Sequence, residues 1–265
     1  MHSQSKADMY HMQGAPLYVI VSSQKGPIFP NKGDQERFWR ITRRFVDELG
    51  DAYIEGGTSS AVNAVYPDSG VAAMLSYQWK EDKKFRITSL NDRRPVQPED
   101  ELVVVVAPDP PGADECLSMI KQVSNKEQEE GLPEKPIVLF NQRLASGDVG
   151  LGLNVRRMRN FVLKDFAITY SLRPLGFGEV GTVYRRYPGM WQVFLQDPEL
   201  PGRYRLVAEK PSRPEGEYLD YLVQQAMGTM EDEGKEGQQG GAGGIIGQLQ
   251  RTANSLNSFM KSLSK

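Results

Sequence analysis

An uninterrupted apolar segment, Leu102-Val103-Val104-Val105-Val106-Ala107, stands between the acidic Glu101 and Pro108. A strand with one solvated face alternates apolar and polar residues, whereas this segment is apolar throughout. It predicts a strand buried on both faces, as in a parallel sheet that helices cover on both sides. The segment Pro136-Ile137-Val138-Leu139-Phe140 repeats the pattern and predicts a second buried strand.

The segments on either side alternate between strand and helix patterns. Further strands are predicted at 17–22, 60–66, 85–90 and 166–172, with Pro174 ending the last of them. Helices are predicted at 34–49, 70–79, 114–124 and 154–163. Asp34 is a plausible cap and Gly50 a plausible stop for the first helix, and residues 126–133 read as a charged loop.

The pattern changes after Pro174. Strands are predicted at 182–187 and 190–196 around the turn Pro188-Gly189, followed by a strand at 203–209 and a helix at 217–227. Repeated strand–helix units followed by a hairpin predict an α/β fold. We expect a three-layer sandwich with a mainly parallel sheet and an antiparallel edge hairpin.

The C-terminal part has a different composition. Residues 229–244 are acidic and rich in glycine, which predicts a linker. Residues 245–265 predict an amphipathic helix with three basic residues and no acidic residue. Its apolar positions recur at helical spacing: Ile245, Leu249, Ala253, Leu256, Met260 and Leu263. The predicted organisation is a leader at 1–15, an α/β domain at 16–228, the linker, and this helix. Behind a flexible tether the helix is expected to contact a membrane surface or a partner protein, and docking on its own domain is the alternative.

The composition restricts the chemistry. The formal charge is -2 and there is one cysteine, so an internal disulfide is impossible. The two histidines, His2 and His11, lie in the leader, so residues 12–265 contain no imidazole. A Ser-His-Asp arrangement or a histidine zinc site cannot be built there. We predict no catalytic residue, no metal ligand and no cofactor, and no segment resembles a membrane span.

One motif invites a nucleotide-binding interpretation. The segment Gly176-Phe177-Gly178-Glu179-Val180-Gly181-Thr182-Val183-Tyr184 matches the glycine loop of protein kinases. The other kinase motifs are missing, and a dinucleotide loop should lead into a helix, whereas strand residues follow here. The sequence favours an ordinary glycine loop.

Polar residues follow the predicted parallel strands and predict a binding crevice. They are Asp68, Ser69, Asp109, Asn141, Arg143 and Arg173, to which we add Asn154 and Arg157 from the start of a helix. In open α/β sheets the carboxyl ends of the strands form the ligand crevice, and Arg143 and Arg173 would face an anionic group. The alternative is that these residues cap helices and tie loops together.

Arg156, Arg157 and Arg159 form a basic cluster. No row of aromatic residues accompanies them to stack bases, so no nucleic acid partner is expected.

Five segments in order resemble a known family. They are Val65-Tyr66-Pro67-Asp68-Ser69-Gly70, Lys135-Pro136-Ile137-Val138-Leu139-Phe140-Asn141-Gln142-Arg143-Leu144, Gly150-Leu151-Gly152-Leu153-Asn154-Val155-Arg156-Arg157, Tyr170-Ser171-Leu172-Arg173-Pro174-Leu175 and Tyr187-Pro188-Gly189-Met190-Trp191-Gln192-Val193-Phe194. The chain resembles, over about residues 16–225, the plastid and cyanobacterial domains of unknown function typified by the low photosystem II accumulation factors.

The resemblance implies a protein of the chloroplast stroma and the stromal face of the thylakoid. It would be a non-catalytic factor in photosystem II assembly, with a core subunit or a membrane insertase as partner and a possible peripheral membrane contact. A similar domain is fused to a plastid adenylate kinase in related proteins. A nucleotide- or anion-binding module is therefore the alternative.

Overall fold

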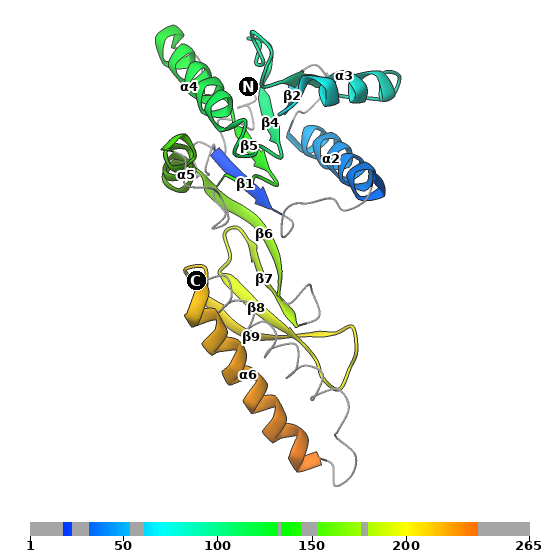
Figure 1. Ribbon diagram of the computed structural model, residues 1–265, viewed down its shortest axis with the longest axis vertical. Coiled ribbons are helices and arrows are strands. Elements are labelled where there is room, and N and C mark those ends of the chain that lie inside the picture. Colours follow the sequence, from blue (N-terminus) through cyan, green and yellow to red (C-terminus); the bar gives the residue numbers. More distant parts are fainter. Residues whose placement is uncertain are drawn as a thin grey trace, which may run out of the picture. The chain divides into compact units, whose positions relative to one another are not determined.

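The computed structural model describes residues 18–22, 32–53, 61–131, 134–144, 153–175 and 180–237. The chain forms two compact units, which divide between Ile168 and Thr169. Parallel strands build the first unit and antiparallel strands build the second (Figure 1). The predicted α/β fold, with a parallel part and an antiparallel part, is confirmed.

The first unit contains a parallel sheet in the order β3-β2-β4-β5-β1. Its strands are β1 (Tyr18–Ser22), β2 (Val62–Tyr66), β3 (Arg86–Ser89), β4 (Leu102–Val106) and β5 (Ile137–Phe140). Every residue of β4 and β5 is buried, as their apolar segments predict, and every residue of β2 is buried as well.

Four helices cover the two faces of this sheet (Figure 1). They are α2 (Lys32–Tyr53), α3 (Ser69–Gln78), α4 (Ala113–Glu130) and α5 (Leu153–Asp165). Because successive side chains of a strand point to opposite faces of the sheet, β4 contributes side chains to two hydrophobic cores. Val103 and Val105 pack with residues of α4 and α5, whereas Val104 and Val106 pack with residues of α2 and α3. The first unit is thus a three-layer sandwich.

Cys116 of α4 lies in the first of these cores and is completely buried. Burial raises the pKa of its thiol to about 12. We expect a thiol reagent such as a disulfide dye to leave the folded protein unmodified at pH 8 and to modify one thiol per chain in denaturant. In the unfolded chain the thiol ionises near pH 8.5. The buried thiol stays protonated in the folded chain, so the free energy of unfolding should fall as pH rises from about 8.5 towards 12. Rapid modification of the folded chain would contradict this burial.

Two predictions about α2 were wrong. The helix begins at Lys32 and continues to Tyr53, so Asp34 is not its cap and Gly50 does not stop it. An added β-carbon at Gly50 would lie 3.1 Å from Cγ2 of Val62. Gly50 therefore allows α2 to approach β2 closely.

The prediction of a charged loop at 126–133 was also wrong for residues 126–130. Residues up to Glu130 continue α4, because lysine, glutamate and glutamine favour helices as well as solvent. Similarly, α6 (Gly216–Gly237) runs beyond the predicted helix and into the segment predicted as a linker. The predicted helix at 245–265 lies outside the described residues.

The second unit contains an antiparallel sheet in the order β6-β7-β8-β9, followed by α6. Its strands are β6 (Ala167–Leu175), β7 (Gly181–Arg186), β8 (Trp191–Gln196) and β9 (Tyr204–Lys210). Pro174 was wrongly predicted to stop a strand, since it lies within β6 opposite Thr182.

One face of this sheet is buried. Its central side chains, Val183, Trp191, Val193 and Leu195, are at most 2% exposed. The guanidinium carbons of Arg185 and Arg213 lie 5.3 and 5.8 Å from the centre of the Trp191 ring. The ammonium nitrogen of Lys210, which pairs with Trp191, lies 5.8 Å from the ring of Tyr218. The start of α6 is therefore on this face.

Candidate functional site

The predicted crevice lies at the carboxyl edge of the parallel sheet. Strands β2, β4 and β5 run in the same direction, so the residues that follow them share this edge. Asp68 follows β2, Asp109 follows β4, and Asn141 and Arg143 follow β5. The backbone N–H of Arg143 donates to the carbonyl of Pro108 at 2.9 Å, which ties the last two loops together.

The backbone is strained where β4 and β5 end. Ala107 has φ 45° and Asn141 has φ 51°, both in the left-handed region that favours glycine. Such a conformation costs roughly 1–2 kcal/mol for an L-residue. Strain of this kind concentrates at functional sites, where it aims neighbouring groups.

The carboxylates at this edge have local roles. Asp68 caps α3, because its Oδ1 accepts from the backbone N–H of Val71 at 2.8 Å. Asp109 accepts from the backbone N–H of Gly112 at 3.2 Å. Burial lowers the pKa of Arg143, and the charge of Asp109 opposes that effect. The capping interpretation therefore holds for Asp68. The negative charge of Asp109 offsets the positive charge of Arg143, which would otherwise attract an anion.

The other residues of the predicted crevice are more scattered. Ser69 is the exposed first residue of α3, and Arg157 is exposed on α5, which also contains Asn154. Arg173 lies on β6 in the second unit, so it does not join Asn141 and Arg143 within one unit. A ligand role for these residues remains a prediction.

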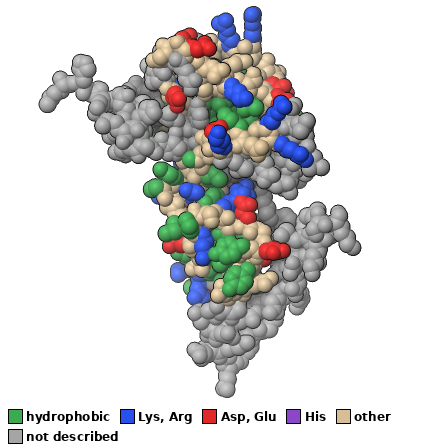
Figure 2. Space-filling view, turned by 90° about the vertical axis from the view of Figure 1, so that its left-hand side faces the viewer, with side chains coloured by type: hydrophobic (Ala, Val, Ile, Leu, Met, Phe, Trp, Pro, Cys, Tyr) green, Lys and Arg blue, Asp and Glu red, His purple; other side chains and the backbone are tan. Residues whose placement is uncertain are grey.

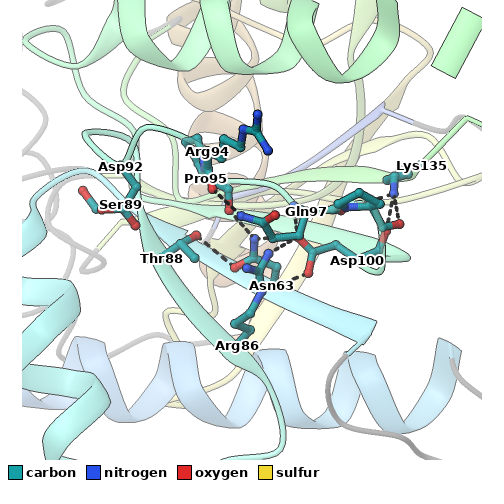
Figure 3. Close-up of polar contacts among 11 residues, drawn as sticks. Asn63, Arg86, Thr88, Ser89, Asp92, Arg94, Pro95, Gln97, Asp100 and Lys135 are labelled. Atoms are coloured by element: carbon teal, nitrogen blue, oxygen red, sulfur yellow. Dashed lines mark hydrogen bonds and ion pairs between the residues drawn. The ribbon is translucent and has the colours of Figure 1, made fainter. Parts of the chain in front are cut away.

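A polar network occupies the opposite, amino-terminal edge of the parallel sheet (Figure 3). Asp100 is 1% exposed, and its carboxylate accepts from Nε of Arg86 at 3.1 Å, Nδ2 of Asn63 at 3.0 Å and the backbone N–H of Gln97 at 2.8 Å. Nη2 of Arg86 also pairs with it. Lys135 donates to the carbonyl of Asp100 at 2.7 Å.

Sequence reasoning missed this network. Its members precede or begin β2, β3, β4 and β5, so no single strand-end motif contains them. Each oxygen of the Asp100 carboxylate accepts at least one hydrogen bond, and a satisfied buried network holds strands in place. We therefore assign it to stability.

A surface hollow of about 550 Å³ lies between α2 and the segment that follows α3. Its lining includes Trp39, Arg43, Asp47, Trp79 and Lys84. Arg43 pairs with Asp47 at 3.6 Å, and burial raises the pKa of Asp47 although this arginine opposes it. Four cations and four carboxylates line the hollow, so it has no net charge to select an ion.

The second face of the antiparallel sheet is rich in aromatic side chains. Cross-strand pairing places Leu172 opposite Tyr184 and Phe194 opposite Leu206. Directly paired residues share a face, and so do residues two apart on a strand. We call this surface the aromatic face and define it as Tyr170, Leu172, Tyr184, Phe194, Tyr204 and Leu206.

The rings of the aromatic face form a row across three strands. The ring of Tyr184 lies 5.7 Å from that of Tyr170 and 6.4 Å from that of Phe194, both edge-to-face. Tyr204 and Leu206 are 48% and 46% exposed, and the other members are partly exposed. Burial raises the pKa of Tyr170, and the neighbouring Tyr184 adds to the effect.

Other large exposed apolar side chains occur elsewhere in the second unit, where apolar and charged side chains are interspersed on the surface (Figure 2). They include Tyr187, Met190, Tyr218 and Tyr221, which are 42–57% exposed. Tyr218 is on the Trp191 face, so the aromatic face itself is the candidate interaction surface, since exposed apolar patches mark interaction sites. Along β8, the apolar Trp191, Val193 and Leu195 alternate with Gln192, Phe194 and Gln196, and this period of two could have indicated a sheet with two different faces.

The described residues offer no other obvious chemistry. No cluster of histidine, cysteine or carboxylate side chains suited to a metal ion occurs among them. No helix in the described ranges is both long and apolar enough to cross a bilayer.

A comparison with models of known protein families gave a match. A family model described as "Domain of unknown function (DUF1995)" matches residues 18–221. A search of curated proteins gave no match.

Proposed function

Because this chain belongs to the DUF1995 family, and because its second unit exposes the aromatic face, we propose that it is a non-catalytic assembly factor. It binds a photosystem II core subunit, or the insertase that delivers one, at the stromal face of the chloroplast thylakoid. The resemblance of five ordered sequence segments supports the choice of client and compartment.

The aromatic face is the observation that carries the proposal. Aromatic side chains dominate the binding energy of protein interfaces, and a rigid sheet presents them without loss of loop entropy. The carboxyl edge of the parallel sheet supports an anion site less well, because Asp68 caps a helix and Asp109 offsets the charge of Arg143. The geometry therefore favours holding a protein over binding a nucleotide.

The test is affinity purification of the tagged full-length chain from solubilised thylakoid membranes. We expect the wild type to recover an identified photosystem II core subunit. The double variant Tyr184→Ser/Phe194→Ser should recover it at least tenfold less, since each ring contributes about 1–2 kcal/mol or more to such an interface.

The matched control is Tyr77→Ser, because Tyr77 is 82% exposed on α3 in the first unit. Its recovery should equal that of the wild type. Recovery that the aromatic-face substitutions leave unchanged, or a wild type that recovers no such subunit, would contradict the proposal.

A further inference from the structure

The aromatic face has the dimensions of a helix-binding surface. Its residues span β6, β7, β8 and β9, and neighbouring strands lie about 4.8 Å apart, so the face is about 14 Å wide. An α-helix with its side chains is about 10 Å wide. One helix laid across these strands would cover Tyr184, Phe194 and Leu206 together.

The charges on this face are few. Arg186, which pairs with Tyr170, and Glu209, which pairs with Gln192, are the charged side chains that the register places there. The side chain of Gln192 donates to that of Glu209 at 2.7 Å. A single-stranded nucleic acid needs a positively charged groove beside its stacking rings, so this surface suits an apolar partner better.

The chain itself contains a partner of this kind. The segment 245–265 has an apolar stripe at helical spacing, including Leu249, Leu256 and Leu263. As a helix the segment is about 30 Å long, similar to α6, whose 22 residues extend about 33 Å. A helix that returns in the opposite direction to α6 would therefore be long enough to reach back along the sheet.

The connection between them is long enough. Seven residues, 238–244, separate the end of α6 from the stripe. They reach up to about 24 Å when extended, whereas two helices on opposite faces of a sheet lie about 20 Å apart, since each layer lies about 10 Å from the sheet. The start of α6 contacts the Trp191 face beside β9, the last strand of the sheet (Figure 1). The chain can therefore pass around β9 to the aromatic face.

We propose that residues 245–265 form a helix that packs its apolar stripe on the aromatic face of the same chain. The tail then covers the surface that the client is proposed to bind, so client binding requires its displacement. The competition between the tail and the client rests on the proposed function. The packing of the tail on the aromatic face does not, and it can be measured on the isolated chain.

Hydroxyl-radical footprinting of the purified full-length protein tests the packing. Oxidation of Tyr184 and Phe194 is measured by mass spectrometry, with the exposed Tyr77 as the internal reference. We expect Leu249→Ser/Leu256→Ser to raise both rates about threefold or more relative to the wild type. The matched control Asn254→Ser/Asn257→Ser changes polar positions of the same segment and should leave the rates unchanged.

Equal rates in all three proteins would overturn the inference. Protection that falls on dilution would overturn it too, because a second copy of the chain would then be the occupant. Protection lost after nuclease treatment would identify RNA instead. None of these results depends on recovery of a photosystem II subunit, so the inference and the proposed function can fail separately.

Discussion

Replacing Asp100 by alanine is expected to lower the free energy of unfolding by about 3–5 kcal/mol, the usual cost of removing one partner from a buried ion pair. The substitution leaves the guanidinium of Arg86 and the amide of Asn63 without their buried acceptor. It also frees the backbone N–H of Gln97. Because these donors come from β2, β3 and the loop before β4, the amino-terminal edge of the sheet should loosen as a whole.

Urea denaturation followed by circular dichroism measures the effect. The matched control is Glu101→Ala, which changes the adjacent exposed carboxylate and should alter stability by less than about 0.5 kcal/mol. A loss below about 1 kcal/mol for Asp100→Ala would show that the network does not hold these strands together.

Gly181→Ala is expected to destabilise the second unit by about 2–3 kcal/mol, the upper range for overpacking. An added β-carbon at Gly181 would overlap the carbonyl oxygen of Phe194 and lie 3.0 Å from Cα of Leu195. Both atoms belong to the backbone of β8, which cannot move aside without breaking its pairing with β7. The glycine that completes the kinase-like motif thus has a packing role.

Hydrogen exchange provides the measurement, because it reports each unit separately. Amides of β7 and β8 should exchange about 30–150 times faster in Gly181→Ala, while those of β4 keep their rates. Gly112→Ala serves as the control, since an added β-carbon there meets Leu90 and Asp109 at ordinary distances of 3.5 and 3.6 Å. Unchanged exchange in β7 and β8 would mean that the strands tolerate the extra carbon.

The parallel part of the fold could be predicted because burial on both faces leaves a plain mark in the sequence. Four consecutive valines in β4 indicate a strand that is buried on both faces. Helix ends were harder to predict. Gly50 has the sequence signature of a helix end, but the structure places it within α2, close to Val62 of β2. No local sequence pattern indicates that α2 packs against this strand.

The candidate site was predicted in part. The strand ends were correctly identified as one edge of the sheet, since parallel direction follows from the strand–helix alternation. The roles of single residues depend on partners distant in sequence, such as Asp109 beside Arg143. The aromatic face was missed because its members come from four strands, and their shared side depends on the register between strands.

The position of β1 has a consequence for biosynthesis. This strand is synthesised well before β5, yet it pairs in parallel with β5, where Tyr18 meets Ile137. It must wait until residues 137–140 emerge, and pairing between such distant segments is slow. The apolar residues of β2 and β4 are exposed during that interval. A holding chaperone should therefore bind nascent chains that end before residue 137 and release longer ones.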